Sequence, residues 1–166
     1  MKVLFLVRHA RARGAAPGQD DRERALTEGG EDDASALGRR LAALDIAPQR
    51  LLTSPAIRAA STAGLIAETT GHGPGEVEIV DALYDALSET ILDVVRGLDD
   101  RTARVAVIAH NPGIGELAQA LSPPIAGFPP GAVAILRIDT DRWAEVGTAR
   151  VLEAWQETPD SGGWPA

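Results

Sequence analysis

Two apolar runs without polar interruption dominate the hydrophobic pattern of the chain. Residues 3–7 and 105–109 contain only aliphatic residues and one phenylalanine. Such runs are typical of strands covered by helices on both faces, whereas a strand with one solvent-exposed face alternates apolar and polar residues. We therefore predict two central strands. Shorter or more mixed segments predict four further strands, at 49–53, 77–80, 132–138 and 150–155.

Helical patterns separate these strands. Apolar residues recur with helical spacing from Ala34 to Leu44, with acidic residues before them and arginines later, as the helix dipole favours. Ser54-Pro55 and Asn111-Pro112 each place a capping side chain before a proline, which predicts a helix start, and Gly71 is suited to end the first of these helices. Ser88 is expected to cap a helix that runs to Leu98. Strand and helix alternate, so the expected fold class is α/β.

The length and composition describe one ordinary globular domain. The chain has 166 residues, of which 45% are hydrophobic and none is cysteine. We expect a single domain at 1–158 and a loose tail at 159–166, which is rich in proline and glycine. The absence of cysteine excludes disulfides and thiol catalysis. The net charge of -8 argues against nucleic-acid or anionic-membrane partners. The run at 3–7 is too short for a signal or membrane segment, so we expect a cytoplasmic location.

Four residues of the right chemistry are expected to meet at one edge of the sheet. Arg8 and His9 end the first strand, His110 follows the strand at 105–109, and Arg58 lies one turn past Ser54-Pro55. Because parallel strands end at a common ligand crevice, these side chains predict one pocket. Arginines and helix N-termini suit an anion with several oxygens, most simply a phosphoryl group. Two separated histidines beside arginines do not match a zinc site, and no glycine-rich nucleotide loop is present. We therefore expect a histidine nucleophile, no metal and no cofactor.

Four motifs in this order resemble the histidine phosphatase superfamily, whose fold is phosphoglycerate mutase-like. They are Leu6-Val7-Arg8-His9, Leu26-Thr27-Glu28-Gly29-Gly30, Ser54-Pro55-Ala56-Ile57-Arg58-Ala59 with Thr62, and His110-Asn111-Pro112-Gly113. The resemblance covers about residues 2–122 and implies a three-layer α/β/α architecture with a mostly parallel sheet. About thirty residues separate His72 from Arg104, too few for a large cap insertion. The chain is therefore most similar to the SixA-type phosphohistidine phosphatases.

The resemblance implies a role for each of the four residues. His9 is the expected nucleophile, which forms a phosphohistidine enzyme that water then hydrolyses. Arg8, Arg58 and His110 are expected to bind the nonbridging oxygens of the phosphoryl group. We also expect the second ring nitrogen of His9 to donate to a backbone acceptor, which fixes its tautomer. Glu89 and Asp85 are both candidates for a general acid, and no local motif decides between them.

The expected function is that of a metal-independent phosphatase, most simply one acting on phosphohistidine in a partner protein. Two alternatives remain open: a phosphomonoesterase for small molecules, and a module that binds phosphorylated ligands with little turnover. A mutase is disfavoured because the chain has no room for the insertion that mutases carry. An imidazole leaving group, with an ordinary pKa of about 6.5, needs less help from an acid than an alkoxide does.

The loop after His9 is unusually rich in charge. Its arginines at positions 11, 13, 22 and 24 either contact the substrate or are simply solvated, and the latter is the commoner case. Asp20 and Asp21 are expected to neutralise part of this charge. His72 lies between two glycines, so we expect an exposed loop residue without a role in the site.

Overall fold

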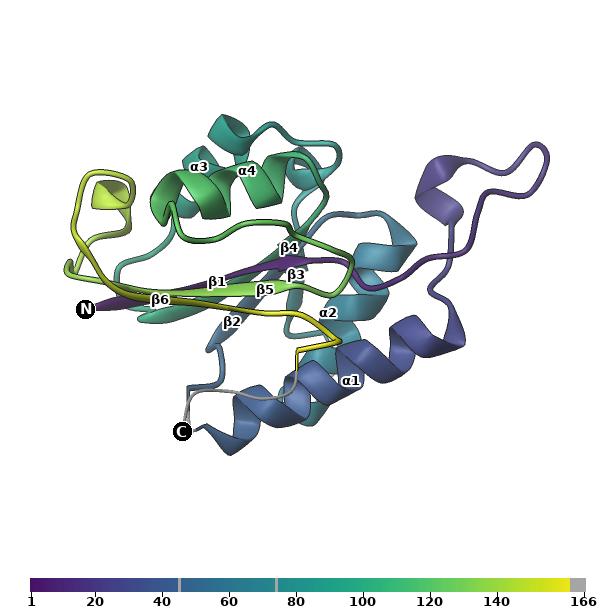
Figure 1. Cartoon of the computed structure of the whole chain (residues 1–166), viewed down its shortest axis with the longest axis horizontal. Helices are drawn as coiled ribbons and strands as arrows, with labels where there is room; N and C mark the ends of the chain where they lie inside the picture. The colour runs from purple at the N-terminus through teal and green to yellow at the C-terminus, as the bar shows by residue number, and fades with distance from the viewer. Residues whose placement is uncertain (45, 74, 162–166) are drawn as a thin grey trace.

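The computed structural model describes residues 1–44, 46–73 and 75–161, which contain a six-stranded sheet between two layers of helices (Figure 1). The strand order is β3-β2-β4-β1-β5-β6. The strands are β1 Lys2–Arg8, β2 Arg50–Thr53, β3 Val77–Ile79, β4 Arg104–Ala109, β5 Val133–Ile138 and β6 Val151–Glu157. The first four strands pair in parallel, and β5 pairs antiparallel with β1 and β6. The predicted three-layer, mostly parallel α/β/α fold is confirmed.

The helices form one layer on each face of the sheet. One layer holds α1 (Glu28–Ala43) and α2 (Ile57–Thr69), and the other holds α3 (Ser88–Arg96) and α4 (Gly113–Leu121) (Figure 1). Short 3₁₀ helices in the connections are η1 Asp21–Glu23, η2 Asp81–Leu83 and η3 Trp143–Glu145. None of the described helices is both long enough and apolar enough to cross a membrane.

The unbroken apolar run of β1 is explained by its position between the two helical layers. Leu4 and Leu6 pack into the cluster beneath α3 and α4, whereas Phe5 and Val7 pack into the cluster beneath α1 and α2. All four side chains are fully buried. Successive residues of a strand point to opposite faces, so a strand with two dry faces needs apolar residues at every position. Both predicted central strands are confirmed, and the four mixed segments form the remaining strands.

One predicted helix start was wrong. Ser54 does not cap α2, because the helix begins at Ile57 and its N-cap position is Ala56, which has no side-chain cap. The Ser54 hydroxyl instead accepts from the backbone N–H of Ala56 at 3.2 Å and lies 2.6 Å from a ring nitrogen of His110. Ser54 and Pro55 therefore form a turn before the helix, and the serine side chain contacts His110, which follows the neighbouring strand β4.

The other helix boundaries followed the sequence more closely. Ser88 is the first residue of α3 rather than its cap, and the helix ends at Arg96, two residues earlier than predicted. Asn111 lies one residue before the N-cap of α4, yet its side chain accepts from the backbone N–H of Gly115 at 3.2 Å and so caps the first turn. Gly71 follows α2 with a φ of 82°, the left-handed conformation typical of a helix end.

The predicted domain of 1–158 stays a prediction, as does the loose tail at 159–166. Residues 159–161 follow β6, and 162–166 lie outside the described part of the chain.

Candidate active site

The ends of β1 and β4 bring two histidines to the same edge of the sheet. These strands pair in parallel with Arg8 opposite Ala109, so His9 and His110 each follow directly after a paired position. Their ring centroids lie 5.3 Å apart. Both side chains are buried. The two histidines predicted from the apolar runs therefore lie together at one edge of the sheet.

His9 is oriented by its own backbone neighbourhood. Its Nδ1 lies 2.7 Å from the carbonyl oxygen of Ala10, so Nδ1–H donates and the lone pair of Nε2 faces the site. Burial lowers the pKa of His9 to about 4; the bond to Ala10 raises it in part, and the charges of His110, Arg58 and Arg8 lower it. The imidazole is therefore neutral near pH 7, as a nucleophile must be. The backbone acceptor expected for the second ring nitrogen of His9 is therefore the carbonyl oxygen of Ala10.

Arg58 reaches His9 from the first turn of α2. Its Nε lies 3.3 Å from Nε2 of His9, and its guanidinium is buried. Thr62 fixes this turn, because its hydroxyl donates to the carbonyl of Arg58 at 2.7 Å and accepts from the backbone N–H of Ala10 at 3.0 Å. Helix α2 is thereby tied to Ala10, the residue that follows His9.

Ser54 contacts one ring nitrogen of His110. The Ser54 hydroxyl lies 2.6 Å from Nε2 of His110, and Nδ1 of His110 is buried without a hydrogen-bond partner among the described residues. The pKa of His110 is lowered to about 4, mainly by burial; the charges of Arg58 and Arg8 add to this lowering, and the charge of Asp21 opposes it. With Ser54 on Nε2, a neutral ring can carry its proton on Nδ1 and offer it to a bound oxygen.

Arg8 completes the sheet-borne part of the site. Its Nη1 donates to the carbonyl of Phe128 at 3.0 Å, and its Nε is buried without a partner among the described residues. Burial lowers the pKa of this guanidinium. The segment after Phe128 is fixed in turn, because the backbone N–H of Gly131 donates to the carbonyl oxygens of Arg8 and His9 at 3.2 and 3.0 Å. Arg8 thus keeps donors free beside His9.

The segment of residues 11–27, which we name the arm, extends from the end of β1 and returns to α1 (Figure 1). Its two legs are joined by a bridge between Ala12 and Leu26, and the backbone N–H of Thr27 donates to the carbonyl of Arg11 at 2.9 Å. The 3₁₀ helix η1 lies on the arm and carries Asp21 toward the site. The arm therefore supplies the part of the site that the sheet does not.

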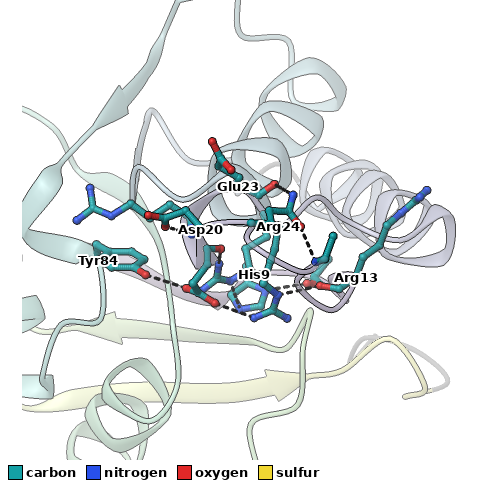
Figure 2. Close-up of polar contacts among 12 residues, drawn as sticks. His9, Arg13, Asp20, Glu23, Arg24 and Tyr84 are labelled. Carbon is teal, nitrogen blue, oxygen red and sulfur yellow. Dashed lines mark hydrogen bonds and ion pairs between the residues drawn. The ribbon is translucent and has the colours of Figure 1, made fainter.

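The carboxylate of Asp21, on the arm, is the centre of a polar network, and Figure 2 labels two of its partners, Arg24 and Tyr84. It accepts from Arg58 Nη2 at 2.9 Å, from the Tyr84 hydroxyl at 2.8 Å and from Arg24 Nη1 at 3.0 Å. The backbone carbonyl of Asp21 also accepts from Arg58 Nη1 at 2.7 Å. The hydrogen bonds from Tyr84, Arg24 and Arg58 hold the pKa of Asp21 well below its usual range, and Asp21 in turn raises the pKa of Tyr84.

A cavity of about 610 Å³ opens beside His9. It is bounded by Arg8, by Arg11 and Arg24 of the arm, and by the first turn of α1 at Thr27. In α1 the Thr27 hydroxyl accepts from the backbone N–H of Gly30 at 3.0 Å and caps the helix. Arginines and a helix N-terminus favour an anionic ligand in this space.

The structure brings together the four residues predicted from sequence: Arg8, His9, Arg58 and His110. The two candidates for a general acid, Asp85 and Glu89, are exposed, and no hydrogen bond or ion pair among the described residues joins either to these four. Across residues 1–44, 46–73 and 75–161 no group of three or more His, Asp or Glu residues is placed to hold a metal ion.

Sequence reasoning missed three partners of the site. Asp21 was expected only to neutralise arginines, and it pairs with Arg58 as well as Arg24. Tyr84 was not singled out, although it contacts Asp21, and Ser54 was expected to cap a helix rather than to contact the buried His110. No spacing rule marks them; Tyr84 is the one tyrosine of the chain, which was the only available signal. His72 is partly buried rather than exposed, and its Nδ1 lies 2.9 Å from the Thr70 hydroxyl.

Comparison with known proteins gives a consistent result. Residues 4–103 match the model of the histidine phosphatase superfamily, branch 1. A protein histidine phosphatase SixA solved with tungstate has a TM-score of 0.78 at 26% identity, covering 95% of this chain and 97% of that one. A provisionally assigned phosphohistidine phosphatase SixA from Nakamurella multipartitia has a TM-score of 0.80 at 25% identity, with coverage of 96% and 97%. An uncharacterised protein of Picosynechococcus sp. is 29% identical over 119 residues, which are 72% of each chain.

Proposed function

The chain belongs to the histidine phosphatase superfamily and is a phosphatase, and from that premise we propose that it hydrolyses phosphohistidine in a partner protein through a phosphoryl group carried on His9. The observation that carries this proposal is the state of His9, a buried, neutral imidazole whose Nδ1–H is held by Ala10 and whose Nε2 faces Arg58. The SixA-type relatives support the choice of substrate.

The first step transfers the phosphoryl group to the enzyme. Nε2 of His9 attacks phosphorus in line, the new P–N bond forms while the bond to the leaving atom breaks, and the bonding electron pair departs with the leaving group. Arg8 and Arg58 offer N–H donors to the nonbridging oxygens, and His110 offers its Nδ1–H. Preorganised donors in a buried site stabilise the charge that spreads over these oxygens.

The second step restores the enzyme. Water attacks the phosphorus of the phosphohistidine, the P–N bond breaks, and its electron pair returns to Nε2 of His9. The proton lost by water ends on the released inorganic phosphate or in solvent, and His9 is again neutral. No metal ion takes part in either step as written.

The substrate class is supported by the openness of the site. The connection between β3 and β4 holds only η2 and α3 as regular structure, so no large cap closes over the histidines. A partner protein can therefore bring a phosphorylated side chain to His9. We also propose a cytoplasmic location for the enzyme, from the same charge and hydropathy pattern that argues against nucleic-acid and membrane partners.

The cavity beside His9 favours a second candidate, hydrolysis of small phosphate monoesters. Its volume of about 610 Å³ falls in the range of sites that bind small molecules. In this case the arginines of the arm would contact the rest of the substrate.

The deciding experiment compares a phosphohistidine-containing protein with p-nitrophenyl phosphate, both in the presence of EDTA. We expect faster hydrolysis of the phosphohistidine protein, retention of activity in EDTA, and an acid-labile phosphoenzyme that His9→Asn does not form. Preference for p-nitrophenyl phosphate would select the small-molecule phosphatase. Binding of vanadate without turnover of either substrate would contradict hydrolysis and identify a module that binds phosphorylated ligands.

A further inference from the structure

Asp21 places a negative charge where an anionic substrate must bind. Its side chain is 45% exposed, whereas that of Arg58 is 5% exposed, so the carboxylate lies between the buried guanidinium and solvent. Three donors hold it there, from Arg58, Tyr84 and Arg24 (Figure 2). A phosphoryl group that binds to Arg58 beside His9 therefore meets this carboxylate.

The geometry of Arg58 brings the carboxylate close to the nucleophilic atom. Nε–H and one N–H of Nη2 lie on the same edge of a guanidinium and form its two-pronged donor. In this structure Nε faces Nε2 of His9 and Nη2 is bonded to Oδ2 of Asp21. Adjacent nitrogens of Arg58 therefore contact His9 and the carboxylate of Asp21. Nε and Nη2 are the pair of nitrogens that would otherwise bind two oxygens of a phosphoryl group.

In the free enzyme, Asp21 therefore occupies donors of Arg58 that a phosphoryl group would need. The lone pair of His9 Nε2 faces the N–H of Arg58, and both terminal nitrogens of Arg58 are bonded to Asp21, through the carboxylate and through the backbone carbonyl. A phosphoryl group must take Nη2 of Arg58 from Asp21. The displaced carboxylate stays close to the bound phosphoryl group, because Arg24 and Tyr84 still donate to it.

The two chemical classes of substrate meet this carboxylate differently. The leaving oxygen of a phosphate monoester carries no hydrogen, so it is repelled by an ionised Asp21 and cannot take a proton from it. A phosphoimidazole protonated on its second ring nitrogen has an N–H that can donate to the carboxylate. When its P–N bond breaks, the electron pair goes to the leaving nitrogen, and a neutral imidazole departs with the proton it already carries.

We propose that Asp21 is a specificity-determining residue that competes with the phosphoryl group for Arg58 and favours phosphoramidates with an N–H leaving group over phosphate monoesters. This inference rests on the proposed function, in which His9 and Arg58 bind the phosphoryl group. It also explains how such a site works without a separate general acid, because the leaving imidazole arrives protonated. The low pKa of Asp21 is consistent with a group that accepts hydrogen bonds and donates none.

The test compares kcat/KM for N-phosphoimidazole and p-nitrophenyl phosphate in Asp21→Asn, together with the affinity for vanadate by calorimetry. We expect the preference for N-phosphoimidazole to fall by about tenfold or more, and vanadate to bind at least about fivefold more tightly, since a competing charge is removed. Asp21→Glu keeps the charge and is expected to retain most of the preference.

Asp20→Asn is the matched control. It removes the same charge from the same arm, and Asp20 caps η1 by accepting from the backbone N–H of Arg22, a bond that asparagine can also accept. Both the preference and the vanadate affinity should stay unchanged in this variant. If the Asp21→Asn variant does not fold, Tyr84→Phe removes one of the three donors of the carboxylate, and it should also tighten vanadate binding.

Two outcomes would overturn the proposal. An equal fall in kcat/KM for both substrates with unchanged vanadate affinity would make Asp21 a structural tie of the arm. If Asp20→Asn lowers the preference for N-phosphoimidazole as much as Asp21→Asn does, the effect comes from the general charge of the arm and not from Asp21. Failure of the proposed function can be told apart from failure of this inference. If the wild-type enzyme hydrolyses neither substrate, the difference in vanadate affinity between the wild type and Asp21→Asn still measures the competition for Arg58.

Discussion

The two halves of the site differ in how they are held. Arg8, His9 and His110 lie at the ends of central strands, with the histidines buried and each side chain fixed by a contact to backbone or to a buried serine. The arm carries Asp21 and Arg24 on an excursion outside the sheet, where both are partly exposed. In the proposed mechanism the sheet half holds the groups that react with phosphorus, whereas the arm half holds groups that contact the rest of a substrate.

This difference assigns different tasks to the two halves. Catalysis needs donors and a nucleophile that do not move when charge develops, and buried strand ends provide such rigidity. Selection of a substrate tolerates exchange of partners, which a surface loop anchored by a few polar contacts can undergo. Arg58 belongs to both halves, because its helix lies on the sheet and its terminal nitrogens bind the arm.

The largest effect is expected from the sheet half, at His9. Replacement by asparagine removes the nucleophile while keeping a polar side chain of similar size, so kcat should fall by at least about ten-thousandfold on every substrate. Thermal unfolding of the variant should remain close to that of the wild type. Residual turnover within about tenfold of the wild type would show that another group attacks phosphorus.

Arg58→Ala tests the residue shared by both halves. Loss of a buried donor that stabilises the transferring phosphoryl group should lower kcat/KM by roughly a hundred- to a thousandfold. Arg58→Lys keeps the charge but not the two-pronged edge and should recover only a small part of this loss. Full activity of the lysine variant would contradict a role for the paired nitrogens of Arg58 that contact His9 and Asp21.

The pH profile separates buried histidines from exposed ones. The pKa values of His9 and His110 are lowered to about 4, so both rings stay neutral as the pH falls from 7 to 5 and become protonated only near pH 4. Activity should therefore persist at pH 5, where a histidine of ordinary pKa would be only about one-thirtieth neutral. The measurement is kcat/KM from pH 3.5 to 8, corrected for titration of the substrate. An acid limb centred near pH 6.5 would refute the burial argument.

Ser54→Ala tests the support of His110. The serine holds Nε2 of this ring at 2.6 Å, and removal of one hydrogen bond that sets the tautomer should lower kcat about tenfold with little change in KM. Ser54→Thr keeps the hydroxyl and should restore most of kcat. An increase in KM alone would indicate that Ser54 contacts the substrate rather than His110.

The smallest effect is expected at the base of the arm. Thr27→Ala removes the side-chain cap of α1 and should lower the free energy of unfolding by about 1 kcal/mol in urea titrations. Thr27 borders the cavity beside His9, but no hydrogen bond among the described residues joins it to Arg8, His9, Arg58 or His110, so turnover of p-nitrophenyl phosphate should change by less than about twofold. A fall in turnover well beyond twofold would show that the arm and the strand ends act as one unit.

The same division explains what the sequence could predict. The apolar runs of β1 and β4 needed no tertiary information, since strands with two dry faces show in the sequence itself, and the strand-end rule then located His9 and His110. Arg58 followed from its distance to Ser54-Pro55. The predicted capping role of Ser54 was wrong because the choice between a helix N–H and His110 depends on how β2 and β4 lie side by side.

The arm was harder to predict for a physical reason. It has no hydrophobic period, and its contacts depend on where η1 comes to lie rather than on any repeat in the chain. Asp21 was therefore expected to neutralise arginines of its own loop, and the contacts with Arg58 and Tyr84 could not be foreseen. Tyr84 follows η2, on a connection whose path is set only after β3 has paired with β2.

The position of β1 has a consequence for how the protein comes to be active. The pairing of β1 with β4 joins residues about a hundred positions apart, and such distant pairings form late because a long loop must close first. His9 and His110 meet only when that pairing exists. During refolding, helical signal should therefore return before enzyme activity does, and a nascent chain that has not yet extended through β4 has no catalytic site to expose.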